Sequence, residues 1–153
     1  MTKVDNVVFE GARIGFLNFA GKEGQFNREG DRNFVVFLDN DMAEQLHADG
    51  WNVKTLPERD EDDGPTPYLQ ISVGYKAYPP HVVMIGAQSG ARTELGEGQV
   101  ELLDNVEIAN VDFIIRPYNW EVSGKTGKKA YLKSMFMTIV EDPLELKYAQ
   151  TND

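Results

Sequence analysis

Cationic side chains and large aromatic rings are concentrated between residues 116 and 133. The cations are Arg116, Lys125, Lys128, Lys129 and Lys133, and the rings are those of Tyr118, Trp120 and Tyr131. Glu121 is the one acid in this stretch. Cationic groups contact phosphates and flat rings stack on bases, so a surface of this composition can hold a single-stranded nucleic acid.

The spacing of these residues predicts a β-hairpin. If the turn is the four residues Gly124 to Gly127, Trp120 lies opposite Tyr131 and Tyr118 lies opposite Lys133. The rings and several cations would then share one face as a platform for bases. In the alternative interpretation the rings belong to the core or its rim, and the lysines keep an exposed edge soluble. A one-residue slip would also send the partner strand's side chains to the other face.

Two further segments could extend this platform. The glycine-rich loop from Ala20 to Asp31 carries Lys22, Phe26 and Arg28, and Arg32 follows it. Such a loop could close over a bound strand as a flap, although a solvated hairpin loop explains the pattern equally well. Lys76 lies on the outward face of a predicted strand whose ends carry Tyr68 and Tyr78. Tyrosines at strand ends also suit the sealing of a barrel mouth.

The sequence predicts no catalytic residue, metal site or cofactor, and we expect the protein not to be an enzyme. There is no cysteine, and His47 and His81 lack the spacing of metal ligands. Gly124-Lys125-Thr126 lacks the first glycine of a phosphate-binding loop, and the acidic loops lack complete calcium-ligand spacing. A metal-dependent nuclease built from the scattered carboxylates is therefore disfavoured.

Length and charge are those of one acidic domain. The chain has 153 residues and a formal net charge of -10 at pH 7, which argues against a general coat for duplex DNA. No apolar run is long enough to span a membrane, and the first residues have no signal-peptide core, so a cytoplasmic location is expected. We expect a single domain over residues 1–142 and a mildly acidic, flexible tail over 143–153.

Alternating apolar and polar residues predict an all-β fold. In Tyr68 to Ala77 the inward face would carry Leu69, Ile71, Val73 and Tyr75. The other predicted strands are Val7 to Phe19, bent at its glycines, Asn33 to Leu38, Trp51 to Leu56, His81 to Ile85, Val111 to Val122 and Lys128 to Val140.

The remaining segments are predicted to be one helix and several loops. A short helix from Asp41 to Gly50 has a capping-box spacing between Asp41 and Glu44. Pro57 to Pro67 and Gly86 to Gly98 are predicted loops, and Glu94 to Asn105 could be a strand or a helical turn. These elements favour a small β-barrel with one short α-helix and long glycine-rich loops.

Several runs resemble small single-stranded DNA-binding proteins of tailed bacteriophages. They are Asn18 to Phe34, Gly50 to Lys54, Ile115 to Trp120 and Ala130 to Lys133. The resemblance spans roughly Phe9 to Val140 and implies an oligonucleotide-binding (OB) barrel. It also implies that the protein coats single-stranded DNA with little sequence preference during phage replication or recombination, in the cytoplasm of the host cell. Replication or recombination proteins are the implied partners. The segment Glu141 to Asp153 departs from the strongly acidic tails common in such proteins.

A rival hypothesis assigns the protein to another class. An acidic phage structural or host-interaction protein would dock through, or mimic nucleic acid with, the loop from Glu58 to Asp63. Formation of an oligomer stays open under either hypothesis.

Overall fold

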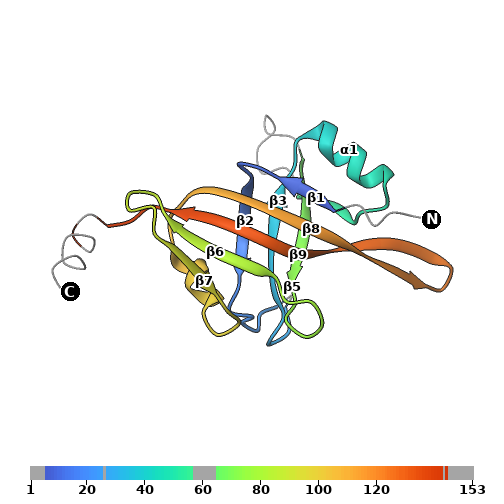
Figure 1. The fold of residues 1–153 in the computed structure, drawn as a ribbon. Helices are drawn as coiled ribbons and strands as arrows, with labels where there is room; N and C mark the ends of the chain where they lie inside the picture. The colour runs from blue at the N-terminus through green and yellow to red at the C-terminus, as the bar shows by residue number, and fades with distance from the viewer. Residues whose placement is uncertain (1–5, 26, 57–64, 143, 145–153) are drawn as a thin grey trace.

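The described part of the chain contains nine β-strands, one α-helix and one 3₁₀ helix (Figure 1). The computed structural model describes residues 6–25, 27–56, 65–142 and 144. The strands are β1 (Val7–Phe9), β2 (Arg13–Asn18), β3 (Arg32–Phe37), β4 (Val53–Leu56), β5 (Thr66–Val73), β6 (His81–Gly86), β7 (Arg92–Leu95), β8 (Ile108–Val122) and β9 (Lys125–Ile139). The predicted all-β class with one short α-helix is confirmed.

The strands form one curled sheet in the order β1-β8-β9-β5-β3-β2. β4 adds to β5, and β6 lies between β7 and β9. The β5–β9 and β6–β9 pairings are parallel, whereas the others are antiparallel. No pairing joins β1 to β2 among the described strands, so the sheet is a half-barrel wrapped around one core.

Aromatic rings fill the centre of the core. Phe113 stacks on Phe9 with 4.8 Å between the ring centroids, and the edge of Phe34 meets Phe113 at 5.4 Å. Leu69, Ile71 and Val73 of β5 are buried on one face, as the alternation predicts. Tyr75 lies beyond the end of β5 and is only half-buried.

The predicted single bent strand from Val7 to Phe19 is wrong, because it forms two strands with different partners. β1 pairs with β8, and β2 pairs with β3. Between them Gly11 has a φ of 57°, a left-handed conformation that glycine adopts without steric cost. The Gly11 N–H donates a 2.8 Å hydrogen bond to Asp112 Oδ1, which holds this break against β8.

The helix α1 spans Asn40–Ala48 and begins one residue earlier than predicted. Asp39 is its N-cap, because Asp39 Oδ1 accepts a 2.7 Å hydrogen bond from the Met42 N–H. The predicted capping role of Asp41 is therefore wrong. Gly50, the predicted stop, has a φ of 94°. No helix in the described part of the chain is long and apolar enough to cross a membrane.

The predicted loop from Gly86 to Gly98 contains a strand. Residues 92–95 form β7, which pairs with β6. The ambiguous segment Glu94 to Asn105 therefore contributes the end of β7 and then a 3₁₀ helix, η1 (Val100–Asn105). Most of the predicted acidic loop, residues 57–64, lies outside the described residues, and Thr66 already belongs to β5.

Candidate nucleic-acid interface

β8 and β9 form a long antiparallel ribbon that extends beyond the rest of the sheet (Figure 1). Val122 pairs with Lys125, so the turn consists of Ser123 and Gly124, with φ values of 52° and 79°. Two left-handed residues make the tight turn that matches the twist of a hairpin. The predicted four-residue turn is therefore wrong.

The corrected register still keeps the predicted side chains on one face. Trp120 pairs with Gly127, Tyr118 with Lys129, and Arg116 with Tyr131. Residues 115–122 of β8 thus pair four positions earlier in β9 than predicted. Since side chains alternate with a period of two, an even shift leaves every side chain on its original face.

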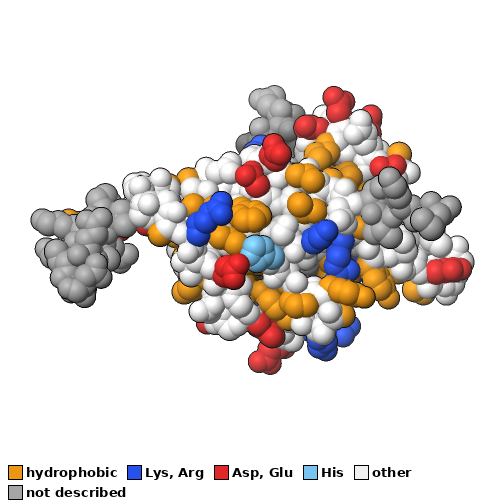
Figure 2. All heavy atoms as spheres, viewed as in Figure 1, with side chains coloured by type: hydrophobic (Ala, Val, Ile, Leu, Met, Phe, Trp, Pro, Cys, Tyr) orange, Lys and Arg blue, Asp and Glu red, His pale blue; other side chains and the backbone are white. Residues whose placement is uncertain are grey.

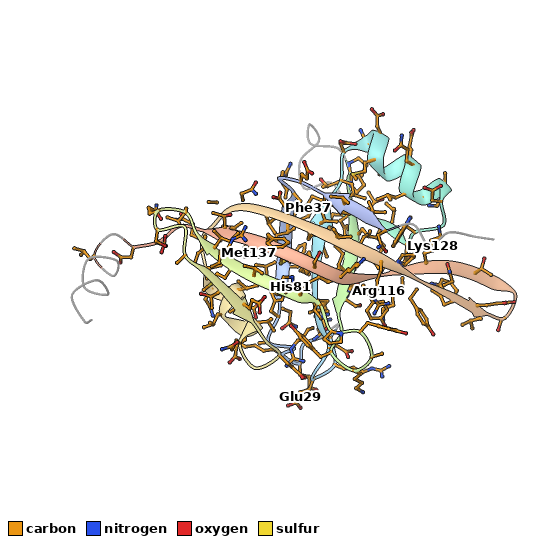
Figure 3. The ribbon with its side chains drawn as sticks, in the orientation of Figure 1. Glu29, Phe37, His81, Arg116, Lys128 and Met137 are labelled. Carbon is orange, nitrogen blue, oxygen red and sulfur yellow. The ribbon has the colours of Figure 1, made fainter. Side chains whose placement is uncertain are left out.

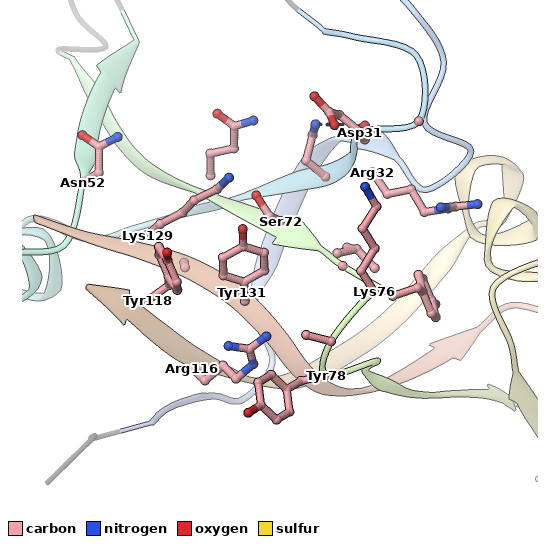
Figure 4. A pocket seen from close by; sticks show the side chains of 18 of the residues that line it. Asp31, Arg32, Asn52, Ser72, Lys76, Tyr78, Arg116, Tyr118, Lys129 and Tyr131 are labelled. Carbon is pink, nitrogen blue, oxygen red and sulfur yellow. Dashed lines mark hydrogen bonds between the residues drawn. The ribbon is translucent and has the colours of Figure 1, made fainter. Parts of the chain in front are cut away.

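A groove lies along this face, between the ribbon, the outward side of β5 and the start of β3 (Figure 4). We call it the aromatic groove, and its volume is about 1070 Å³. It brings together seven of the residues predicted from the sequence: Arg32, Lys76, Arg116, Tyr118, Trp120, Lys129 and Tyr131. Its charged lining consists of four cations and two acids, Asp31 and Glu97, so the groove is locally cationic in an acidic protein.

Tyr131 lies at the centre of the groove. The Arg116 guanidinium is 5.0 Å from the centroid of its ring, and Lys129 Nζ is 5.1 Å from the same centroid. The edge of the Tyr118 ring approaches at 6.0 Å between centroids. Cation–π contacts of this kind hold a cation beside a ring without neutralising its charge. Flat surfaces and phosphate-binding groups are therefore held side by side.

Tyr78 adds a second ring next to Arg116. The guanidinium lies 5.0 Å from the Tyr78 centroid as well, and Tyr78 is 70% exposed. The sequence interpretation favoured a sealing role at the barrel mouth for this residue, whereas the structure places it in the groove lining. The available signal was the alternation of Lys76 and Tyr78 in step with the outward face of β5.

Small polar side chains complete the lining, and sequence reasoning did not select them. Gln70 and Ser72 lie on the outward side of β5, and Asn33 and Asn52 come from β3 and the segment before β4. The alternation within β5 indicates the outward position of Gln70 and Ser72. Nothing local to Asn52 indicates its place, because that place depends on contacts with distant segments: the neighbouring Trp51 forms a bridge with Lys128 of β9, and β4 pairs with β5.

The end of the groove near β3 contains a half-buried phenol and an ion pair. The Arg32 guanidinium lies 5.4 Å from the centroid of Tyr75, and Arg32 Nη1 is 3.4 Å from Glu97 Oε1. Burial raises the pKa of the Tyr75 phenol; the nearby Arg32 charge opposes this rise and Glu97 adds to it. Tyr75 is therefore a neutral hydroxyl at physiological pH.

Lys128 and Lys133 do not line the groove. Lys128 Nζ lies 5.7 Å from the centroid of the buried Trp51, and the Lys128 backbone N–H donates a hydrogen bond to the Gly50 carbonyl. Figure 3 labels Lys128 on the ribbon near the end of α1. Lys128 therefore covers the opposite side of the ribbon from Lys129. Lys133 is the extra residue of β9 at the register shift between Ile114 and Ile115, so its predicted pairing with Tyr118 is wrong.

The remaining predicted cations also lie apart. Lys125 is exposed at the tip of the ribbon, and Lys22 is exposed in the loop between β2 and β3. Arg28 lines a separate depression together with the acids Glu23, Glu29 and Asp31. Phe26, part of the same predicted flap, lies outside the described residues, as does the acidic segment from Glu58 to Asp63.

Basic and acidic side chains are interspersed on the face of the sheet shown in Figure 2, and neither kind covers that face. His81 lies on this face and forms a 2.8 Å hydrogen bond with Glu94. No cluster of three histidine or carboxylate side chains suited to a metal ion occurs among the described residues.

Comparisons with known proteins identify a matching family and a similar fold. A family model described as "Putative phage ssDNA-binding domain" matches residues 1–153. The single-stranded DNA-binding protein of bacteriophage Enc34, truncated at its C-terminus, has a similar structure with a TM-score of 0.55 and 15% sequence identity; the match covers 90% of this chain and 87% of that one. The same phage protein in complex with ssDNA also gives a TM-score of 0.55, at 14% identity and with 90% and 88% covered. These similarities confirm the expected OB-like fold. No curated protein matches the sequence.

Proposed function

The chain belongs to the phage ssDNA-binding domain family, and we infer that it binds single-stranded DNA along the aromatic groove. The arrangement around Tyr131 is the observation that carries this inference. The cations Arg116 and Lys129 lie within 5.1 Å of the centroid of its ring, and Tyr118 lies beside it. The same groove also contains Trp120 and Tyr78.

The aromatic rings and the cationic side chains of the groove recognise different parts of a DNA strand. Rings in the groove stack on unpaired bases, and each stacked base contributes about 1–3 kcal/mol. Arg116, Lys129, Lys76 and Arg32 contact phosphates. Every base has a flat face and every nucleotide a phosphate, so binding of this kind has little sequence preference. In a duplex the faces of the bases are covered by neighbouring base pairs, so the aromatic side chains of the groove cannot stack on them.

The proposal extends to the biological role of this binding. The protein coats DNA strands exposed during phage replication or recombination, and it acts by binding rather than by catalysis. Family membership and the lining of the groove support this role, and proteins of replication or recombination would be its partners.

A titration with fluorescent oligonucleotides tests the function. Oligo-dT and a duplex of equal length are titrated with protein at two salt concentrations, and binding is followed by anisotropy. We expect tight binding of oligo-dT that weakens steeply as salt rises, and much weaker binding of the duplex. Equal affinity for the two DNAs, or affinity for oligo-dT that does not change with salt, would contradict the proposal.

A second titration, in which unlabelled oligo-dT is added to the protein, uses the intrinsic tryptophan fluorescence to locate the bound strand. Trp51 is only 3% exposed, whereas Trp120 lines the groove. Quenching on addition of oligo-dT should therefore come from Trp120 and disappear in Trp120→Phe. Quenching that persists in this variant would place the strand elsewhere.

A further inference from the structure

Arg32 and Glu97 form an ion pair at one end of the aromatic groove. Arg32 belongs to β3, and its side chain is 22% exposed; Glu97 lies in the turn between β7 and η1, and its side chain is 59% exposed. The 3.4 Å separation of Arg32 Nη1 and Glu97 Oε1 is longer than the roughly 2.7–2.9 Å of a strong hydrogen bond between charged groups. The carboxylate is therefore held loosely and is exposed to solvent.

The groups around this ion pair have unused donors. Arg32 Nε and the Tyr75 hydroxyl are both buried, and neither has a hydrogen-bond partner among the described residues. A buried donor without a partner is costly, and it is satisfied when a ligand brings an acceptor. Arg32 and Tyr75 both line the groove, so an anion that reaches this end lies close to both groups.

We propose that Glu97 is a built-in competitor for the phosphate-binding site on Arg32. In the free protein its carboxylate occupies part of the position that a phosphate of bound DNA takes, and it must leave when the strand enters. Glycines flank it at positions 96 and 98, and its exposure gives it room to turn away. This inference rests on the proposed function, because it assigns a regulatory residue to the same groove.

The competition has a defined consequence for binding. Each strand that enters must break the Arg32–Glu97 contact and place a phosphate near a carboxylate, so the affinity is lower than the cations of the groove alone would give. The same carboxylate recaptures Arg32 when the strand leaves. Glu97 therefore makes bound protein easier to remove from the DNA strand.

Glu97→Gln tests the proposal, with Glu101→Gln as its matched control. Both changes remove one negative charge, and Glu101 is exposed on η1 outside the groove lining. Binding of fluorescein-labelled oligo-dT is measured at low and at physiological salt. We expect Glu97→Gln to bind about threefold to tenfold more tightly than the unchanged protein at low salt, and Glu101→Gln to stay within about twofold. Equal affinities of the two variants would overturn the proposal.

A double-mutant cycle shows whether the effect passes through Arg32. In the Arg32→Gln background, Glu97→Gln should no longer tighten binding, because the group that it frees is absent. A gain that persists in this background would overturn the inference. Melting temperatures show whether Arg32→Gln folds; if it does not, the comparison of Glu97→Gln with Glu101→Gln still decides the question.

The same measurements separate this inference from the function on which it rests. If the unchanged protein fails to bind oligo-dT, the proposed function itself is wrong. If the unchanged protein binds oligo-dT and the two glutamine variants bind alike, only the role of Glu97 is wrong.

Discussion

The indole of Trp120 occupies the space that a side chain on Gly127 would fill. The two residues pair across the β8–β9 ribbon, and a Cβ built on Gly127 would lie 2.5 Å from Trp120 Cζ2 and 2.7 Å from Cε2. We expect Gly127→Ala to displace the indole from its place in the groove lining. Affinity for oligo-dT should fall by up to about 1–3 kcal/mol, the contribution of one stacked base, and the tryptophan emission should change.

Gly24→Ala is the control for this change. A Cβ at Gly24 meets nothing within 4 Å, and its φ is not in the left-handed range, so the substitution is sterically tolerated there. Its oligo-dT affinity and emission should match those of the unchanged protein. If Gly127→Ala also behaves like the unchanged protein, the position of the Trp120 ring does not matter for binding.

Two substitutions distinguish the contribution of the Tyr131 ring to binding from that of its hydroxyl. Tyr131→Ala removes the surface beside which Arg116 and Lys129 lie, and should weaken oligo-dT binding by about 1–3 kcal/mol. Tyr131→Phe keeps the ring and should retain most of the affinity. Adding Trp120→Ala to Tyr131→Ala should weaken binding further, by several kcal/mol at most, with circular dichroism unchanged. Undiminished affinity in that double variant would exclude stacking by these two rings.

The neighbouring lysines of β9 form a natural pair for testing phosphate contacts. Lys129 lines the aromatic groove, whereas Lys128 covers Trp51 on the other side of the ribbon. Lys129→Gln should weaken binding and reduce the slope of log affinity against log salt by about 0.7, the value for one phosphate contact on a single strand. Lys128→Gln changes the net charge equally and should leave the slope unchanged. Equal effects of both variants would mean that only overall charge matters.

The inward and outward faces of the strands could be predicted from the sequence, because side chains alternate between the two faces with a period of two residues, which is a local property of the chain. This is why Leu69 and Ile71 are buried, and why Trp120 and Tyr131 share a face even though the turn was misplaced. The turn was misplaced because both Ser123-Gly124 and the longer segment to Gly127 contain residues suited to turns. Strict alternation also puts Lys128 and Lys129 on opposite faces, although both were predicted to contact phosphates.

The assembly of the groove could not be predicted, because it depends on contacts between distant segments. The parallel pairing of β5 with β9 places Ser72 opposite Tyr131 and so brings the outward face of β5 beside the ribbon. The salt bridge from Arg32 to Glu97 likewise joins β3 to a turn far along the chain. No local pattern specifies such pairings, whose cost is the entropy of closing long loops.

Stability should depend on pH through Glu141, which lies just after β9. Its carboxylate accepts hydrogen bonds from the Ser89 N–H, the Ser89 hydroxyl and the Gln88 N–H, and these bonds lower the pKa of Glu141 below the ordinary value of 4.5. Because the folded pKa is the lower one, the contribution to stability is complete above the unfolded pKa and is lost as the pH falls through the folded pKa. Glu141→Gln should therefore melt at a lower temperature than the unchanged protein at pH 7, and this difference should shrink as the pH falls below about 4.5. Glu107→Gln, at an exposed position, removes the same charge without these bonds and is the control. A melting difference for Glu141→Gln that stayed constant down to pH 3 would show that its hydrogen bonds do not favour the ionised carboxylate.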